Sequence, residues 1–502
     1  MKYNERRNLK LSDIKNDNLV VGAKGGVIAF ALKVATTFLN LINQIILARI
    51  IGAGGVGEVL LALSVIKVSS QFAKFGIEET MMRFIPVYLD QKDRSRLKGT
   101  IYFALRFSLI TSFLFMLVIV LLSRFISINL FHSNMLMRLL PVVAISLPAV
   151  VIRDVIGGIL KGYKDAYRAL LPEAVISPIF RIMIFLILTL KGITPMYAIV
   201  AFVIGEIVAV AVSIGFLSKN ISSIGKVESR CDTKKILEVA YSVIFASVSL
   251  FLYTQTDLWV LGYFEAKDVV GVYGVTAKMV LLVYFPMFAF ASVVPSLFSS
   301  SYASGDYKEL EKVTRQSSRW ILSMAMPIVL GLFLEGKFVL RYLYGAGFER
   351  GYIVLVILTI GHLVNTSTGL VGFFLQMTGQ HKFYMRINIL YGLLNLILNI
   401  LLVPYYGMIG AAISTAFCLS LLELTCTFFV YKRFSISMLP ERFMFDVIFI
   451  VVSSFLYIYL SYNKNYFGYH ILLLISIVIY MLKSIINNDI PWKLLITRFK
   501  EV

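Results

Sequence analysis

Residues 83–108, RFIPVYLDQKDRSRLKGTIYFALRFS, and residues 293–320, VVPSLFSSSYASGDYKELEKVTRQSSRW, share one plan in the two halves of the chain. Each stretch holds a helix end with proline, a charged turn and a basic amphipathic helix. A second pair agrees: residues 158–182, GILKGYKDAYRALLPEAVISPIFRI, and residues 373–397, FFLQMTGQHKFYMRINILYGLLNLI. Any two membrane hairpins look partly alike, but several matches in the same order at a similar spacing favour an internal repeat.

The composition places both copies of the repeat in a membrane. Of 502 residues, 59% are hydrophobic and 15% are charged, and the mean hydropathy is +0.83. Soluble proteins have about 45–50% apolar and about 25% charged residues. Apolar segments long enough to span a bilayer recur along the whole chain. The sequence therefore predicts an all-α integral membrane protein and excludes a soluble domain with a single anchor.

We expect about fourteen transmembrane helices, forming two repeated six-helix bundles around a central cavity plus two C-terminal helices. Because each copy has an even number of spans, the two copies share one orientation and are related by an axis along the membrane normal. The expected spans lie near residues 25–50, 55–77, 99–123, 138–160, 170–190, 195–217, 236–262, 270–298, 319–340, 352–377, 384–404, 407–431, 444–462 and 468–485.

The distribution of basic residues gives the orientation. Of the 48 Lys and Arg residues, 32 lie in the N-terminal segment, in every second connection and in the C-terminal tail, 8 lie in the opposite connections, and 8 lie inside or at the edge of spans. Cytoplasmic loops carry the excess of Lys and Arg. Both termini are therefore expected in the cytoplasm of a multi-pass protein of the cell membrane. The net charge of +20 is mostly this topology signal, and no aromatic and basic module supports nucleic-acid binding.

The same reading divides the chain into parts. We expect an N-terminal bundle over residues 1–217, a cytoplasmic linker over 218–235, a C-terminal bundle over 236–432, and accessory helices with a cytoplasmic tail over 443–502.

Polar residues recur at helical spacing on the first two spans of each copy, which predicts a hydrated cleft with more cations than anions. The candidate substrate-binding residues are Lys33, Asn40, Gln44, Lys67, Gln71, Asp257 and Lys278. Further candidates are Arg106, Arg153, Arg181 and Asn395. Lys67 and Lys278 lie deepest in their spans. When the two copies of the repeat are aligned, their positions differ by no more than about one helical turn.

Structural interpretations stand beside the functional one. Lys74, Arg49 and Arg153 lie close enough to helix ends for their side chains to extend to water. Arg153 beside Asp154, and Arg181 eight residues after Glu173, could each be neutralised locally. Asp257 is expected to pair at a helix end or to balance charge in the cleft. The asparagines of the eleventh span could simply bond between helices.

Few residues support a metal centre or an enzyme active site. The three cysteines have no motif spacing, and the four histidines lie too far apart for a short ligand motif. The outer connections have at most about fifteen residues and bring together no nucleophile, base and orienting group. We therefore expect a transporter with no metal or cofactor. A glycan polymerase or ligase is the least favoured interpretation.

Residues 257–280, DLWVLGYFEAKDVVGVYGVTAKMV, and residues 340–382, LRYLYGAGFERGYIVLVILTIGHLVNTSTGLVGFFLQMTGQHK, resemble the polysaccharide and oligosaccharide flippases of the multidrug, oligosaccharidyl-lipid and polysaccharide exporter superfamily. The resemblance covers nearly all of the chain and includes residues 48–66, ARIIGAGGVGEVLLALSVI. It implies twelve core helices in two bundles, often with two more, and export of lipid-linked sugars. It also implies cations in the cavity, which correspond here to Lys33, Lys67 and Lys278.

The resemblance thus predicts a flippase that moves lipid-linked oligosaccharide or polysaccharide precursors across the cytoplasmic membrane by alternating access, for cell-surface glycan synthesis. Its partners would be a polyprenyl phosphate or pyrophosphate sugar, membrane lipids, and H⁺ or Na⁺ as a coupling ion. Lysines suit the phosphates because they carry point charges. A peptidoglycan-precursor flippase remains open. A cation-coupled drug exporter is less favoured, because the only central charge of the first span is Lys33.

Overall fold

Every regular element is a helix in the part of the chain that the computed structural model describes. The described residues are 2–440 without 226 and 292, together with 443, 445, 446, 448, 449, 452, 453, 455, 475–480 and 483. The expected spans near 444–462 and 468–485 therefore lie largely outside the described residues. The structure confirms the predicted all-α class of multi-pass membrane protein.

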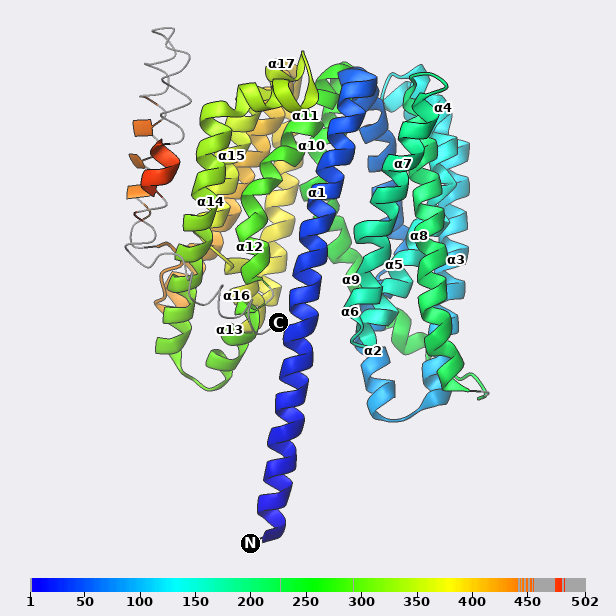
Figure 1. The fold of residues 1–502 in the computed structure, drawn as a ribbon, viewed down its shortest axis with the longest axis vertical. Helices are drawn as coiled ribbons and strands as arrows, with labels where there is room; N and C mark the ends of the chain where they lie inside the picture. Colours follow the sequence, from blue (N-terminus) through cyan, green and yellow to red (C-terminus); the bar gives the residue numbers. More distant parts are fainter. Residues whose placement is uncertain are drawn as a thin grey trace. The chain divides into compact units, whose positions relative to one another are not determined.

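The helices of the first half follow the predicted order of spans (Figure 1). They are α1 (Lys2–Lys74), α2 (Ile77–Asp90), α3 (Arg94–Phe125), η1 (Ile126–Leu130), α4 (Asn134–Ala144), α5 (Ser146–Gly162), α6 (Ala166–Leu171), η2 (Pro172–Ile176), α7 (Ser177–Thr189) and α8 (Pro195–Ile224).

The second half continues with the same kind of element. Its helices are α9 (Thr233–Thr254), α10 (Thr256–Phe264), α11 (Lys267–Val280), η3 (Leu281–Tyr284), α12 (Phe285–Phe290), α13 (Val294–Ala303), α14 (Tyr307–Tyr344), η4 (Phe348–Gly351), α15 (Tyr352–Ser367), α16 (Val371–Met377) and α17 (His381–Phe434).

Eight described helices are long and apolar enough to cross a membrane, and the bent pair of α4 and α5 would make a ninth. Two of the eight contain a break. Gly52 interrupts α1 with φ 67°, and Gly407 interrupts α17 with φ 53°. These breaks fall between the expected spans 25–50 and 55–77, and between 384–404 and 407–431. The total of fourteen spans stays a prediction.

The second span ends close to the expected residue 77, because α1 ends at Lys74. A further helix that the expected spans do not include, α2, begins at Ile77 and runs to Asp90. It forms because Ile77, Met81 and Ile85 recur at helical spacing and are fully buried in the N-terminal core. The charged turn therefore shrinks to a few residues after Asp90.

The first repeated turn has the same hydrogen bonds in both copies. Lys92 and Gly305, which occupy equivalent positions of the repeat, both have positive φ, 55° and 73°. The next amide, of Asp93 or Asp306, donates to the carbonyl five residues earlier at 3.0 Å in both cases. Each aspartate then accepts from the amide three residues later, at 2.9 Å and 3.0 Å, and so begins the following helix. These turns confirm the repeat predicted from residues 83–108 and 293–320.

The second repeated turn agrees at nearly the same spacing along the chain. Lys164 and Gly379 have φ of 64° and 78°. The amides of Asp165 and Gln380 donate to the carbonyls five residues earlier, at 3.0 Å and 2.7 Å. The register of the two copies is therefore nearly constant over this part of the chain.

The chain forms two compact units. The N-terminal unit contains Met1–Ile46 and Leu61–Val248, and the C-terminal unit contains Leu47–Leu60 and Ser249–Val502. In the N-terminal unit, α3, α5, α7 and α8 run beside one another, and in the C-terminal unit α14, α15 and α17 do so (Figure 1). The domain and linker bounds expected from the sequence stay predictions.

A glycine pair lies where residues 47–60 pack inside the C-terminal unit. A Cβ added to Gly57 would lie 1.8 Å from the carbonyl oxygen of Lys267, and a Cβ added to Gly271 would lie 1.9 Å from that of Ala53. Gly57 is separated from Gly271 by the same length of chain as Ala53 from Lys267, and this length is close to the spacing of the repeated turns. The contact is therefore reciprocal between equivalent positions of the repeat, and only glycine lets the two backbones approach this closely.

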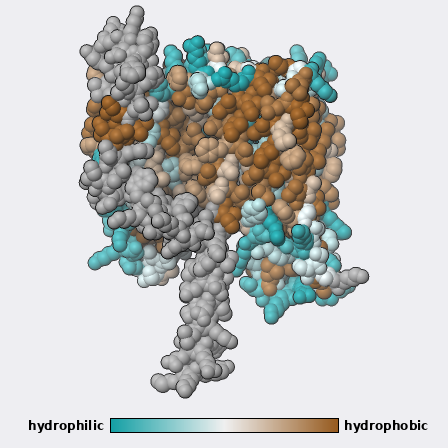
Figure 2. Space-filling model, viewed as in Figure 1, coloured by the Kyte–Doolittle hydropathy of each residue, from teal (hydrophilic) through white to brown (hydrophobic). Residues whose placement is uncertain are grey.

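Apolar side chains also cover much of the outer surface of the helices. Figure 2 shows them along the middle of the helices on the visible face, with hydrophilic side chains toward the helix ends. On α3, Ile110 and Leu121 are 69% and 71% exposed. Such residues suit contact with lipid chains, which are as apolar as the side chains themselves.

Candidate functional site

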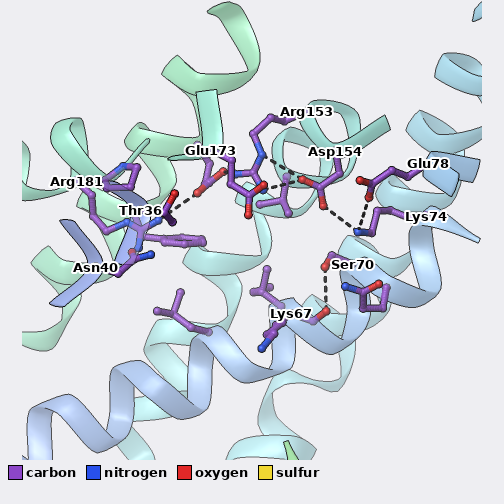
Figure 3. A pocket seen from close by; sticks show the side chains of 17 residues that line it. Thr36, Asn40, Lys67, Ser70, Lys74, Glu78, Arg153, Asp154, Glu173 and Arg181 are labelled. Carbon is purple, nitrogen blue, oxygen red and sulfur yellow. Dashed lines mark hydrogen bonds and ion pairs between the residues drawn. The ribbon is translucent and has the colours of Figure 1, made fainter. Parts of the chain in front are cut away.

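The N-terminal unit contains a polar cavity of about 450 Å³ (Figure 3). Side chains from α1, α2, α5, η2, α7 and α8 line it. Its polar lining residues are Thr36, Asn40, Lys67, Ser70, Gln71, Lys74, Glu78, Arg153, Asp154, Glu173, Arg181 and Glu206. The volume lies in the range of about 300–1,000 Å³ that is typical of small-molecule sites.

Lys74 joins three helices at one end of this cavity. Its Nζ lies 3.0 Å from Glu78 Oε2 on α2 and 3.0 Å from Asp154 Oδ2 on α5, and in Figure 3 the side chain points toward both carboxylates. Lys161 adds a further ion pair to Glu78 Oε1, also at 3.0 Å. Three elements of the N-terminal unit, α1, α2 and α5, are thereby held together by charge.

Arg153 and Glu206 form the centre of a second cluster. Arg153 donates to Asp154 at 2.7 Å and also forms an ion pair with Glu206. The other carboxylate oxygen of Glu206 accepts from the Ser177 hydroxyl at 2.7 Å and lies 3.2 Å from the Arg181 guanidinium. Glu206 is only 2% exposed. A carboxylate buried this deeply is stable only with such partners.

The cavity lining carries balanced charge. Its basic residues are Lys67, Lys74, Arg153 and Arg181, and its acidic residues are Glu78, Asp154, Glu173 and Glu206. The carboxylates come from α2, α5, η2 and α8. The excess of cations predicted for a cleft lined by the first two spans of both copies stays a prediction.

Hydroxyl and amide groups from α1 form the other side of the cavity. Asn40, Lys67 and Gln71 line it together. The hydroxyls of Ser70 and Thr36 are already turned toward the helix backbone, where they donate to the carbonyls of Lys67 and Leu32. The amides of Asn40 and Gln71 and the ammonium of Lys67 are chemical groups that suit a sugar or phosphate.

Lys33 lies beside this cavity in a smaller hollow of about 70 Å³. Thr36 and Glu173 line both spaces. The structure thus brings five predicted residues to the cavity and one to its neighbour. The five are Asn40, Lys67, Gln71, Arg153 and Arg181.

The other predicted residues lie elsewhere. Gln44 is buried on α1, 5% exposed, and Arg106 is exposed on α3. The C-terminal unit holds the remaining three. Asp257 accepts from the Tyr273 hydroxyl at 2.6 Å, Lys278 is exposed on α11, and the amide of Asn395 accepts from Asn399 at 3.0 Å.

Two expectations for charged side chains are wrong. Lys74 and Arg153 do not extend to water, because the carboxylates of Glu78, Asp154 and Glu206 bind them inside the unit. Arg49 is exposed, and its guanidinium donates to the carbonyl of Leu343 at 2.9 Å and to that of Tyr342, near the end of α14. A cation at this place satisfies carbonyls that have no partner within the helix.

The expected local pairing is right for Arg153 and incomplete for Arg181. Arg153 does contact Asp154. Arg181 interacts electrostatically with Glu173, but its ion pair is with Glu206, which sequence reasoning missed. The available signal was that Glu206 is the only charged residue of the apolar stretch 195–218. Within the described residues, no group of three or more His, Cys, Asp or Glu side chains could hold a metal ion.

Sequence comparison finds relatives of this chain among probable glycan flippases. Two proteins of Haloferax volcanii are similar: the probable low-salt glycan biosynthesis flippase Agl15 is 25% identical over 176 residues (35% of this chain, 37% of Agl15), and the probable flippase AglR is 31% identical over 176 residues (34% and 36%). The match spans little more than a third of each relative. The MatE family model also matches residues 242–401.

The fold is also that of a solved flippase. The lipid II flippase MurJ, in an inward closed conformation, superposes with a TM-score of 0.70 at 20% identity, covering 92% of this chain and 99% of MurJ. The family model described as polysaccharide biosynthesis protein matches residues 23–301, more than half of the chain. With its helical repeat and its polar cavity, this protein belongs to the polysaccharide biosynthesis protein family.

Proposed function

We propose that this protein is a flippase that moves lipid-linked oligosaccharide or polysaccharide precursors across the cytoplasmic membrane. The single observation that carries the proposal is the polar cavity of about 450 Å³ built on spans of a polysaccharide biosynthesis protein. A sugar head group needs hydroxyl and amide partners when it leaves water, because an unpaired buried polar group costs several kcal/mol, roughly 2–7. The names of Agl15 and AglR support the same activity.

In this proposal the head group occupies the cavity of the N-terminal unit, while the polyprenyl tail stays among lipid chains. Asn40 and Gln71 hydrogen-bond the sugar, and Lys67 meets a phosphate. The ion pairs of Arg153 and Lys74 hold the cavity wall in place. Lys33 beside the cavity is a further candidate cation of the N-terminal unit, and Lys278 is the candidate cation of the C-terminal unit.

Rocking of the two bundles would expose the head group first to the cytoplasm and then to the outside, as in other transporters built from repeats. We assign both chain termini to the cytoplasm, because the excess of basic residues lies on that side. H⁺ or Na⁺ would couple export to a gradient.

The test is transport by the purified full chain in liposomes with fluorescent lipid-linked oligosaccharides, followed by a quencher outside. Lys67→Ala and Lys278→Ala are each expected to reduce export about tenfold or more, the loss of one charge-assisted contact of roughly 1.5–3 kcal/mol. Lys67→Arg should restore part of the rate, because charge remains while its geometry changes.

Lys308→Ala is the matched control, since Lys308 is exposed in the first turn of α14 and is not among the residues that line the cavity. Export at the wild-type rate by Lys67→Ala, at equal protein content, would contradict the cavity as the binding site, and the same result for Lys278→Ala would remove Lys278 from the candidates. A peptidoglycan precursor serves as a second substrate, and preferential movement of that lipid would assign the alternative function.

A further inference from the structure

The C-terminal unit contains a buried carboxylate that the proposed site does not use. Glu423 lies on α17 after the break at Gly407, and it is 5% exposed. The Asn365 amide donates to its Oε1 at 2.5 Å, and the Thr368 hydroxyl donates to its Oε2 at 3.1 Å. Both partners are neutral. In the described part of the chain, no basic side chain forms an ion pair with Glu423.

The repeat makes this environment informative. Glu206 lies on the last span of the first copy, α8, and Glu423 lies on the last span of the second copy, within about one helical turn in register. Glu206 is bound by two guanidinium groups. In the register of the second repeated turn, the position of Arg153 is taken by Thr368. The second copy thus also has a buried carboxylate on its last span, with neutral hydrogen-bond donors around it and no guanidinium pair in the described part of the chain.

Further polar groups near Glu423 are buried or half-buried. Tyr284, Tyr384 and Cys426 interact with it electrostatically. His362, one turn before Asn365 on α15, packs its ring edge-on against Tyr284 with centroids 4.6 Å apart. The Nδ1 atom of His362 and the Oδ1 atom of Asn365 are buried and have no hydrogen-bond partner.

The other described helices that pack against α17 bring no cation to Glu423. On α10, Asp257 is bound to Tyr273 of α11, and Tyr273 interacts with Thr415, two turns before Glu423. Lys278 of α11 is exposed and forms no ion pair with Glu423. The segment α16, VGFFLQM, contains no ionisable side chain.

A charge in this position is costly unless it is paired or removed. Binding a proton converts the carboxylate to a carboxylic acid and removes the charge without any other reactant. Asn365 can serve both forms, because its NH₂ group donates to the carboxylate and its Oδ1 atom, after a turn of the amide, accepts from the acid. The unpartnered Oδ1 atom supplies this acceptor.

We propose that Glu423 is a proton-binding site through which a proton gradient is coupled to transport. This step rests on the proposed flippase function for its role, but not for proton binding itself. Protonation changes the hydrogen bonds that join α15 to α17, because the carboxylate accepts from both Asn365 and Thr368 whereas the acid must donate one bond. The proton would thereby alter the attachment of two helices of the C-terminal unit.

The first test is infrared difference spectroscopy of the purified full chain between pH 9 and pH 5. Wild-type protein should develop the carbonyl band of a buried carboxylic acid, and Glu423→Gln should lose that component. Glu309→Gln is the control, since Glu309 is exposed in the same unit, and it should keep the band. Persistence of the full band in Glu423→Gln would overturn the proposal.

Thr368→Val provides a second test if Glu423→Gln does not fold, because this variant still contains Glu423. The band should appear at higher pH in this variant, because one hydrogen bond to the charged form is lost. An unchanged pH profile would contradict the role of these partners.

The second test uses liposomes with lipid-linked oligosaccharide and an imposed pH gradient. With one proton exchanged per substrate, one pH unit changes the equilibrium ratio of substrate across the membrane tenfold. Glu423→Gln should still equilibrate the substrate but lose this response. A response to a sodium gradient and not to pH would overturn proton coupling. The two proposals can fail separately. If Glu423→Gln loses the infrared band but wild-type protein transports no glycan, the proton-binding site stands and the flippase function is refuted.

Discussion

The reciprocal contact of Gly57 and Gly271 makes a sharp prediction for Gly57→Ala. The added methyl carbon would lie 1.8 Å from the carbonyl oxygen of Lys267 and 2.8 Å from its carbon. A carbon and an oxygen in ordinary contact are about 3.3–3.6 Å apart. The two backbones must therefore separate by about 1.5 Å. Because the obstacle is backbone, no side-chain rotation can relieve it.

The expected cost follows from this separation. Overpacking of a tight interior costs about 1–3 kcal/mol, and loss of the neighbouring contacts places Gly57→Ala toward the upper end. Alanine itself favours a helix by about 0.5–1 kcal/mol over glycine. Gly54 is one turn away on the same helix and has no atom within 4 Å of an added Cβ. Gly54→Ala should therefore be neutral or stabilising. Its free energy of unfolding should exceed that of Gly57→Ala by about 2–4 kcal/mol.

Thermal unfolding of the full chain in detergent, followed by tryptophan fluorescence, measures the difference. Gly271→Ala should behave like Gly57→Ala, since its Cβ would lie 1.9 Å from the oxygen of Ala53. The double variant should lose less stability than the sum of the single variants, because both substitutions open one contact. Equal unfolding temperatures for Gly57→Ala and Gly54→Ala would refute the close backbone approach.

Three further outcomes are expected. Arg153→Ala and Glu206→Ala should each cost about 3–5 kcal/mol by leaving a buried charge unpaired, whereas the double variant should cost less than their sum, and strict additivity in thermal unfolding would contradict the cluster. In a chain whose native cysteines are replaced, a cysteine at Lys308 should resist an impermeant thiol reagent in intact cells while one at Ala266 reacts, and the reverse pattern would contradict the topology. Burial raises the pKa of the Cys231 thiol above its ordinary value, so alkylation of Cys231 in purified protein at neutral pH should be slower than that of an exposed cysteine, because fewer thiolates form. The two rates should approach each other as the pH rises above both pKa values. Equal rates at neutral pH would count against the burial of Cys231.

Local features of the fold could be predicted because the same sequence pattern occurs in both copies of the repeat. The charged turns recur at a fixed spacing, and Asp93 and Asp306 mark the same helix start in both copies. The break at Gly52 was also predictable, since it falls in a glycine-rich stretch between two apolar runs. The extent of α2 was not, because its continuation depends on Ile77 and Met81 finding a buried surface on other helices.

The candidate site was less predictable for a related reason. Helical spacing put Asn40, Lys67 and Gln71 on accessible faces of α1, and they do line one cavity. Spacing within one helix cannot tell which other helix faces it. The pairing of Glu206 with Arg153 and Arg181 joins α8 to α5 and α7, and it arises only from their packing. A lone glutamate in an apolar span was the one sign in the sequence.

Residues 47–60 also have a consequence for how the protein is made. They are synthesised with the first hairpin but belong to the C-terminal unit. The stretch of chain from Gly57 to Gly271 takes about 10–40 s to translate at about 5–20 residues per second. During that time α11 does not yet exist, so the backbone of residues 47–60 lies in the bilayer without its partner. The contact forms once α11 has been synthesised. A chain that ends before α11 therefore leaves residues 47–60 accessible to membrane proteases and chaperones.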